Sequence, residues 1–365
     1  MRNMLAVSFF LAGVLCCALQ AKAEDKVVNV YNWSEYIAQD TVANFEKQSG
    51  IKVRYDVYDS DDTLQAKLLA GGSNYDVVVP GSAYMAHQIT AGIYLKLDKS
   101  KIPNLVNLDP VLMKMVALSD PGNRYGVPYT WGSTGIGMNV ADVTKILGKD
   151  VDLDSWDLMM KPDNLAKLSK CGVSVLDSPT DVFPVVLRYL GKNPNSEIAG
   201  DYQAAYDYLK TLRPYISQFN SASYIGDLAN NDICIALGWS GDVLGAEQRA
   251  KDAKRAFEIR YVTPASGAPI WFGLMAIPAG AGHVDAAYQW INYILQPEVH
   301  AAITNEVFYP NGNLASKTFI KPELANNPQI FPTDAMLATM YPELPVSADI
   351  MRLRNRLWQK LKSGV

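Results

Sequence analysis

Positive charge is in deficit in this sequence, which has 33 Lys and Arg residues against 37 Asp and Glu residues and a net charge of -4. This balance argues against a nucleic-acid partner, because a protein that holds a phosphate backbone carries an excess of positive charge. Charged residues make up only 19% of the 365 residues, whereas hydrophobic residues make up 49%. The chain is therefore not disordered, and we expect a large globular core.

Long hydrophobic runs are also lacking, apart from one at the amino terminus. Residues 4–19 are apolar, Arg2 precedes them, and Ala21 and Ala23 place small residues at alternate positions after them. This pattern is typical of a secretory signal peptide, and the run is shorter than the roughly 20 residues of a membrane span. We predict a signal peptide over residues 1–23, cleaved after Ala23, and a soluble mature protein in the periplasm.

Cysteine is scarce, with four residues in the whole chain. Cys16 and Cys17 belong to the predicted signal peptide, so Cys171 and Cys234 remain as an even pair in an exported protein. Such pairs form disulfides in oxidising compartments. We predict a disulfide between Cys171 and Cys234, worth roughly 4 kcal/mol by the loop-entropy model. Two buried thiols are the alternative.

Catalytic and metal-binding motifs are few. The three histidines lie far apart, and none pairs with another at the spacing of a helical metal site. Residues 238–242 resemble a nucleophile elbow, but Asp242 stands where that motif needs glycine. The glycine-rich run 132–137 lacks the lysine of a phosphate loop and predicts a bend or hinge. We therefore predict no catalytic residue, no metal and no cofactor.

Strand and helix patterns alternate along the chain, which indicates an α/β fold with ligands at the carboxyl ends of its strands. In the first part we expect strands at 26–31, 51–58 and 75–79, and helices at 41–48, 61–69 and 83–90, the last capped by Ser82. Further on we expect strands at 172–176, 233–237 and 269–277, and helices at 181–190, 202–212, 242–251 and 284–295.

The length of the mature chain favours two lobes over one core. No flexible linker separates the halves, so we expect strands to cross between the lobes and to act as a hinge. The predicted first lobe comprises residues 24–132 plus about 261–305. The predicted second lobe comprises about 133–260 plus 306–365.

Aromatic residues and carboxylates occur together in five loop-like segments. The acids are Glu35, Asp181, Asp242 and Glu306, and the aromatics are Trp33, Tyr36, Trp239, Trp271 and Tyr309. No Lys or Arg occurs inside these segments. Carboxylates bind ammonium groups by charge-assisted hydrogen bonds, and aromatic faces attract cations, so the segments predict a cation site. Core aromatics with helix-capping acids are the alternative for each segment taken alone, and a sugar site is the alternative ligand.

At these segments the chain resembles a known family, the periplasmic polyamine-binding proteins of ABC importers. The resemblance rests on VYNWSEYIAQDTVANFEKQSGIKV, LAGGSNYDVVVP, ANNDICIALGWSGDV and NEVFYPNGN and extends over essentially the whole mature chain. It implies two α/β lobes, each a sheet flanked by helices, that close on an extended polyamine and deliver it to an inner-membrane permease. We expect a monomer.

The resemblance also implies the ligand-binding residues. Those with aromatic rings are Trp33, Tyr36, Trp239, Trp271 and Tyr309; the amine-binding acids are Asp181 and Asp242; and the polar neighbours are Ser34 and Ser82. Glu35 stands where the putrescine type has Asp.

Two positions bear on the choice of polyamine. Gly273 stands where putrescine binders have an Asp, and Trp271 stands where they have Phe, as in the spermidine-preferring branch. We therefore predict spermidine as the ligand. A putrescine-preferring or sugar-binding receptor is the alternative.

Two other functional classes are also considered. An exported carbohydrate-active enzyme would use two of Glu35, Asp181 and Asp242 as its catalytic acids. A ferric receptor would use tyrosine ligands and would be coloured.

Overall fold

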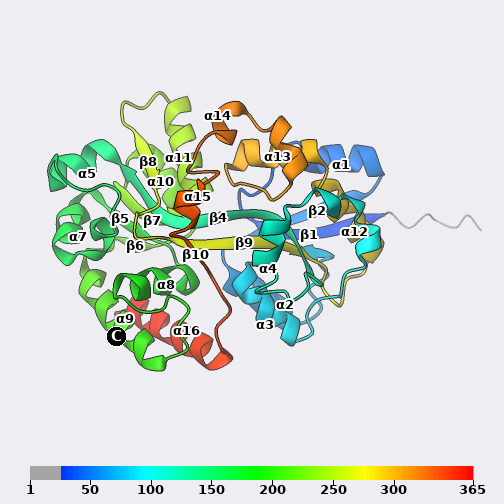
Figure 1. The fold of residues 1–365 in the computed structure, drawn as a ribbon, viewed down its shortest axis with the longest axis horizontal. Helices are drawn as coiled ribbons and strands as arrows, with labels where there is room; N and C mark the ends of the chain where they lie inside the picture. The colour runs from blue at the N-terminus through cyan, green and yellow to red at the C-terminus, as the bar shows by residue number, and fades with distance from the viewer. Residues whose placement is uncertain (1–25, 365) are drawn as a thin grey trace, which may run out of the picture.

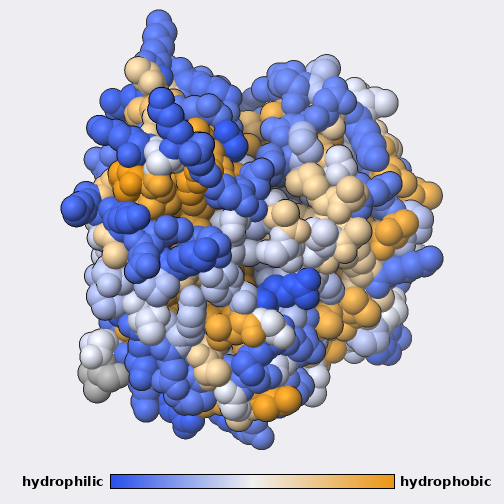
Figure 2. All heavy atoms as spheres, turned by 60° about the vertical axis from the view of Figure 1, so that its left-hand side comes forward, coloured by the Kyte–Doolittle hydropathy of each residue, from blue (hydrophilic) through white to orange (hydrophobic). Residues whose placement is uncertain are grey.

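The computed structural model describes residues 26–364. The predicted signal peptide and its cleavage site lie outside this range. Within it, no helix combines the length and the apolar character that a membrane crossing requires. On the face seen in Figure 2, hydrophilic residues cover most of the surface and hydrophobic residues form separate patches.

The strands form one continuous path in the order β2-β1-β3-β9-β4-β7-β5-β6, with β10 beside β9 and β8 beside β4. Their bounds are β1 (Val27–Trp33), β2 (Lys52–Tyr58), β3 (Val77–Val78), β4 (Gly126–Asn139), β5 (Val173–Val175), β6 (Gln218–Phe219), β7 (Ile235–Trp239), β8 (Ile259–Val262), β9 (Pro269–Ala276) and β10 (Tyr341–Pro342). Strand β1 pairs in parallel with β2 and β3, and β5 pairs in parallel with β6 and β7. Each end of the path is thus a parallel sheet.

Helices cover the sheet on both sides (Figure 1). The α-helices are α1 (Thr41–Ser49), α2 (Asp61–Leu69), α3 (Ser82–Thr90), α4 (Pro110–Val116), α5 (Val140–Leu147), α6 (Asp157–Met160), α7 (Pro162–Leu168), α8 (Pro179–Tyr189), α9 (Ala199–Leu212), α10 (Tyr224–Asn230), α11 (Ser240–Asp252), α12 (Val284–Ile294), α13 (Pro297–Val307), α14 (Pro322–Ala325), α15 (Asp334–Leu337) and α16 (Ala348–Ser363). Five short 3-10 turns complete the described elements, namely η1 (Lys99–Lys101), η2 (Pro103–Asn107), η3 (Ser169–Cys171), η4 (Arg213–Tyr215) and η5 (Leu314–Phe319). The predicted elements all occur, most within three residues of their expected ends.

Two strands, β4 and β9, cross between the two halves of the molecule (Figure 1). The first half of β4 pairs with β9, and its second half pairs with β7 and β8. The run 132–137 lies inside β4, so of the predicted bend or hinge the bend is wrong, while a hinge in this crossing strand stays a prediction. Its glycines serve close packing, because a Cβ at Gly132 would lie 2.7 Å from the Trp271 ring and one at Gly135 would lie 2.4 Å from the Val262 carbonyl oxygen.

The fold is the two-lobed architecture that we expected, with a separate hydrophobic core on each side of the crossing strands. The first lobe carries β1, β2, β3 and α12, and the second lobe carries β5 to β8. Figure 1 shows the carboxyl-terminal helix α16 with the second lobe, where it packs on α8 and α9.

The exact lobe boundaries stay a prediction, and the packing supports a small revision of them. Tyr261 and Val262 in β8 belong to the core of the second lobe, whereas Val307 and Tyr309 belong to the core of the first. We propose that the chain returns to the first lobe along β9 and leaves it again only after Tyr309.

The disulfide between Cys171 and Cys234 is present, which confirms its prediction. It joins the end of η3 to the residue before β7, with 5.5 Å between the two Cα atoms. Because Cys234 directly precedes β7, the bridge anchors a strand whose carboxyl end carries Trp239.

Candidate functional site: the cleft between the lobes

A cleft of about 1030 Å³ lies between the lobes. It is lined at the carboxyl ends of β1, β2, β5 and β7, where the chain leaves each parallel strand for the next helix. This edge of an α/β sheet is the usual place for ligands, because the loops there converge while the strands hold them rigid. Strand β9 and the segments near residues 309 and 343 complete the lining.

All of the predicted ligand-binding residues except Ser82 line this cleft. The lining members are Trp33, Ser34, Glu35, Tyr36, Asp181, Trp239, Asp242, Trp271 and Tyr309. Ser82 is instead the buried first residue of α3, only 2% exposed, and Gly81 before it occupies the N-cap position. Gly81 lines the cleft in its place. The predicted acid Glu306 is exposed and does not belong to the lining.

The aromatic side chains form one connected wall. Trp239 lies 5.7 Å from Trp33 and 6.4 Å from Trp271 between ring centroids, both edge-on. Tyr309 continues the wall, 5.4 Å from Trp271 and 5.0 Å from Tyr36. Such a wall suits the methylene groups of an extended ligand, and its faces attract positive charge.

Asp181 is 6% exposed and sits in the first turn of α8, which follows β5. Its carboxylate accepts hydrogen bonds from Thr134 Oγ1 at 2.5 Å, Ser178 Oγ at 2.5 Å and Trp239 Nε1 at 2.8 Å. Burial raises the pKa of Asp181, and these three donors oppose the shift because they favour the charged form. The donors therefore hold a carboxylate at a fixed place in the cleft.

Asp242, in the first turn of α11, is fixed in a similar way. It accepts hydrogen bonds from the hydroxyl groups of Tyr309 at 2.6 Å and Tyr224 at 2.9 Å. Burial raises the pKa of Asp242 to about 6, and the two tyrosine hydroxyls oppose that shift. The group is thus mainly charged at pH 7.

Glu35 lies at the mouth of the cleft and pairs with Arg249 of α11. The Glu35 side chain is 54% exposed, and the Arg249 side chain is 49% exposed. The pair connects the loop after β1 in the first lobe to a helix of the second lobe. Glu35 therefore bridges the lobes in this structure, a contact that the sequence did not indicate.

Several acids in the cleft were not predicted as site residues from the sequence. Asp61 and Asp62 begin α2 as predicted, but they also line the cleft. Asp61 accepts the backbone N–H of Gly81 at 2.9 Å, and Asp62 accepts the hydroxyl of Tyr84 at 2.9 Å. Withdrawal from water raises the pKa of Asp61 to about 7. The available signal was a cluster of acids directly after a strand.

Glu343 also lines the cleft and is only 8% exposed. It follows β10, a strand of two residues in a part of the chain where no element was predicted. No pattern in the sequence singled it out.

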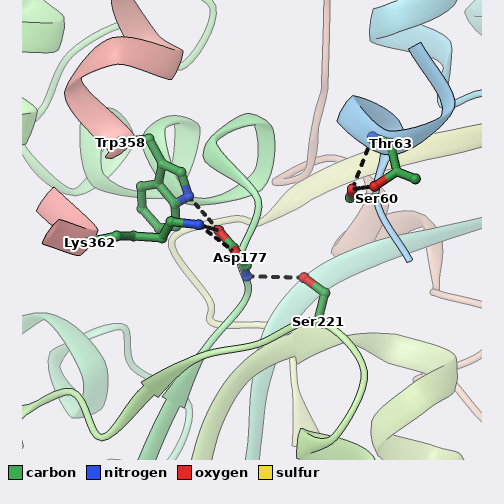
Figure 3. Close-up of polar contacts among 6 residues, drawn as sticks. All are labelled: Ser60, Thr63, Asp177, Ser221, Trp358 and Lys362. Atoms are coloured by element: carbon green, nitrogen blue, oxygen red, sulfur yellow. Dashed lines mark hydrogen bonds and ion pairs between the residues drawn. The ribbon is translucent and has the colours of Figure 1, made fainter. Parts of the chain in front are cut away.

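Asp177 is a cleft acid that already has a counter-ion (Figure 3). Lys362 Nζ lies 2.8 Å and 2.7 Å from its two carboxylate oxygens, and Trp358 Nε1 donates to it at 2.7 Å. Its backbone N–H donates to Ser221 Oγ at 3.0 Å. Helix α16 therefore neutralises this acid from outside the cleft.

The charge of the lining is strongly one-sided. Its acids are Glu35, Asp59, Asp61, Asp62, Asp177, Asp181, Asp242 and Glu343. Among the described residues that line the cleft, none is Lys, Arg or His. An anion would be repelled here, whereas a ligand with several ammonium groups would meet both carboxylates and aromatic faces. Within residues 26–364, no group of three His, Cys, Asp or Glu side chains has an arrangement that could hold a metal ion.

The fold and this cleft define a solute-binding receptor, and comparison with known proteins agrees. The model of the family described as bacterial extracellular solute-binding protein matches residues 40–333. The putrescine-binding periplasmic protein PotF of Escherichia coli (strain K12) is 49% identical over 362 residues, 97% of this chain and 98% of that protein. The putrescine-binding periplasmic protein SpuD of Pseudomonas aeruginosa (strain UCBPP-PA14) is 46% identical over 356 residues, 97% of this chain and 96% of that protein.

A solved structure is similar as well. The spermidine/putrescine ABC transporter substrate-binding protein PotD from Streptococcus pneumoniae superposes with a TM-score of 0.73 at 26% identity, over 93% of this chain and 99% of that chain. This chain belongs to the bacterial extracellular solute-binding proteins, in the family of polyamine-binding receptors for ABC import. Its relatives are transport receptors, which confirms the prediction that it is not an enzyme.

Proposed function

We propose that this chain is a periplasmic receptor that captures spermidine in the cleft, as a monomer, and delivers it to an inner-membrane permease after cleavage of its signal peptide behind Ala23. The observation that carries the proposal is the lining, which combines many carboxylates and a connected aromatic wall with no basic side chain. A sugar would leave these buried acids without a charged partner, which is costly in a closed cleft.

The position of the acids supports a ligand with more than two amines. Asp242 and Glu35 lie at one end of the cleft, where Glu35 raises the pKa of Asp242. Asp61, Asp181 and Glu343 lie at the other end, where the first two raise the pKa of Glu343. Gly273 supplies no carboxylate beside Trp271. The atoms nearest to a Cβ there would be the Thr130 carbonyl oxygen at 3.5 Å, the Tyr36 hydroxyl at 3.5 Å and Val79 at 3.6 Å, which is ordinary contact distance. A triamine can pair with acids at both ends while its methylenes cover the wall.

Putrescine is the second candidate, since two relatives at 49% and 46% identity are putrescine-binding proteins. The two candidates differ in length and charge, so one titration separates them. The mature protein, unfolded and refolded to remove carried-over ligand, is titrated calorimetrically with spermidine and then with putrescine. We expect submicromolar spermidine binding that clearly exceeds putrescine binding. The reverse order would make putrescine the cargo, and no heat with either would overturn the polyamine function.

Trp271 tests the origin of this preference. Its indole contacts Tyr309 and Trp239, and it is wider than the phenyl ring of the putrescine type. We expect Trp271→Phe to lower the ratio of spermidine to putrescine affinity by roughly fivefold, about 1 kcal/mol. An unchanged ratio in the same titrations would remove Trp271 from the account of specificity.

A further inference from the structure

Glu343 is a buried acid whose environment differs from that of the other cleft carboxylates. It is 8% exposed, and its Oε1 atom has no hydrogen-bond partner. Its backbone is fixed, because the Glu343 N–H donates to the Ile270 carbonyl oxygen in β9 at 3.0 Å. A buried carboxyl oxygen without a hydrogen-bond partner is unusual in the lining of a ligand cleft, since buried polar atoms normally have partners.

The groups around Glu343 are mainly acidic. The carboxyl groups of Asp181 in α8 and Asp61 in α2 line the same cleft and are near enough to raise the pKa of Glu343, and Tyr341 lies on β10 just before it. Arg354 of α16 is the cation that faces it. Arg354 is 5% exposed and donates to Thr180 Oγ1 at 2.9 Å, so it is shared with the wall of the second lobe.

One arginine does not balance three carboxylates, so protons must make up the difference when no ligand is present. Burial, and then the neighbouring Asp181 charge, raise the pKa of Glu343 well above its ordinary value. Asp181 keeps its charge more easily, because it accepts three hydrogen bonds from Thr134, Ser178 and Trp239. The proton between the two carboxyl groups therefore belongs mainly to Glu343.

We propose that Glu343 holds a proton against Asp181 in the ligand-free cleft, and that an ammonium group of the ligand displaces this proton on binding. The O–H bond of Glu343 breaks, the proton passes to buffer, and the two carboxylates accept N–H hydrogen bonds from the ammonium group. The inference rests on the proposed function, because it takes the ligand to be a polyamine. It makes Glu343 a specificity-determining residue for ligands that carry an ammonium group to this end.

The sign of the pH dependence follows from this exchange. The Glu343 pKa is high in the free protein and falls in the complex, so binding releases a proton and becomes tighter as pH rises. With one proton released, the dissociation constant of spermidine should fall about tenfold per pH unit between the two pKa values. Polyamine ammonium groups stay charged below about pH 7, as their lysine-like pKa values require, so the proton comes from the protein.

Calorimetry counts the protons that are released when spermidine binds. Spermidine is titrated into the full mature protein at pH 6.5 in buffers of different ionisation enthalpy, and the slope of heat against that enthalpy counts the released protons. We expect Glu343→Gln to release about one proton fewer than the wild type and to bind spermidine about tenfold more weakly, because glutamine keeps the shape of the protonated acid but cannot ionise. The control Glu306→Gln, at an exposed acid outside the cleft, should match the wild type in both respects.

The outcomes separate the inference from the function on which it rests. Equal proton release by the wild type and Glu343→Gln, with spermidine bound by both, would overturn the inference and leave the polyamine receptor standing. Absence of binding heat in the wild type would overturn both. If Glu343→Gln does not fold, Glu343→Met replaces it in the same titrations, because methionine is of similar size and cannot ionise. Release of about one proton fewer than in the wild type would support the inference, and equal release would overturn it.

Discussion

The two ends of the cleft hold acids in contrasting ways. At one end Asp242 accepts hydrogen bonds from two tyrosine hydroxyls, and Glu35 pairs with Arg249. At the other end Asp181 accepts three hydrogen bonds, but its neighbours Asp61 and Glu343 have few donors, and withdrawal from water raises the pKa of both. Acids with several donors are thus stabilised as carboxylates in both parts of the cleft, whereas Asp61 and Glu343, with few donors, are more easily protonated.

The contrast shows what determines the charge of a buried acid. Hydrogen bonds from fixed donors stabilise a carboxylate before any ligand arrives, whereas crowded acids with few donors keep protons until a cation replaces them. The first arrangement binds a cation with little change in protonation. The second arrangement couples ligand binding to pH and favours a ligand that carries positive charge.

The largest effect should come from Trp239, which belongs to both ends. Its Nε1 atom donates to Asp181, and its ring contacts Trp33 and Trp271. We expect Trp239→Ala to weaken spermidine binding about 100-fold, or about 2.7 kcal/mol, because a central aromatic anchor is lost. Calorimetry measures the effect, and circular dichroism checks the fold. Affinity like that of the wild type would mean that the cleft wall is not the binding surface.

The substitution Asp242→Asn tests the end of the cleft that contains Asp242 and Glu35. The amide keeps an oxygen acceptor for the tyrosine hydroxyls but removes the charge, so we expect about tenfold weaker binding at pH 7, or about 1.4 kcal/mol. The Asp242 pKa is raised to about 6, so its contribution in the wild type should be lost as pH falls through 6. Titrations at pH 5 and 7 should then show a smaller difference between wild type and variant at pH 5.

Gly81→Ala tests the opposite end without removing any acid. A Cβ on Gly81 would lie 2.5 Å from Asp61 Oδ2, so the Asp61 carboxyl must move. We expect spermidine affinity to fall roughly threefold to fivefold, about 0.7 to 1 kcal/mol, with a smaller effect on putrescine. Gly280→Ala is the matched control, because a Cβ there meets nothing within 4 Å. Equal losses for both amines would place Asp61 outside the subsite.

The smallest effect should come from the pair at the mouth of the cleft. Arg249 and Glu35 are about half-exposed, and exposed ion pairs contribute about 0 to 1 kcal/mol. We expect Arg249→Met to change spermidine affinity by less than about fivefold, with a difference that shrinks in high salt. A larger loss that persists at 0.5 M salt would show that the pair does more than bridge the lobes.

Much of the fold could be predicted because its signals are local. Asp61 to Leu69 was expected as a helix and is one, since Ser60 caps it and two acids fill its first turn. The glycines of residues 132–137 predicted a bend or hinge, but the backbone there is part of strand β4, and the glycines leave room for Trp271, Tyr309 and Tyr261. Those partners are distant in sequence, so no local pattern reveals them.

The residues of the candidate site also fall into those that a local sequence pattern predicts and those that it does not. Trp33, Asp181, Trp239 and Asp242 lie in or beside segments with aromatic and acidic residues at strand ends, and that pattern places them in the cleft. Ser82 was expected to cap the helix that follows it, but Gly81 occupies the N-cap position and Ser82 is the first residue of α3. The role of Ser82 in ligand binding stays a prediction. Glu343 has no such local signal.

By itself, the sequence determined the alternation of strands and helices, the disulfide partners and the type of ligand chemistry, because each depends on residue types and their spacing. The tertiary structure alone decided which acids face one another and which have donors. Asp177 gains Lys362, 185 residues away in sequence, while Glu343 lies near Asp181 and its Oε1 atom has no hydrogen-bond partner. The charge state of a buried acid depends on neighbours brought together by folding, and no sequence pattern records them.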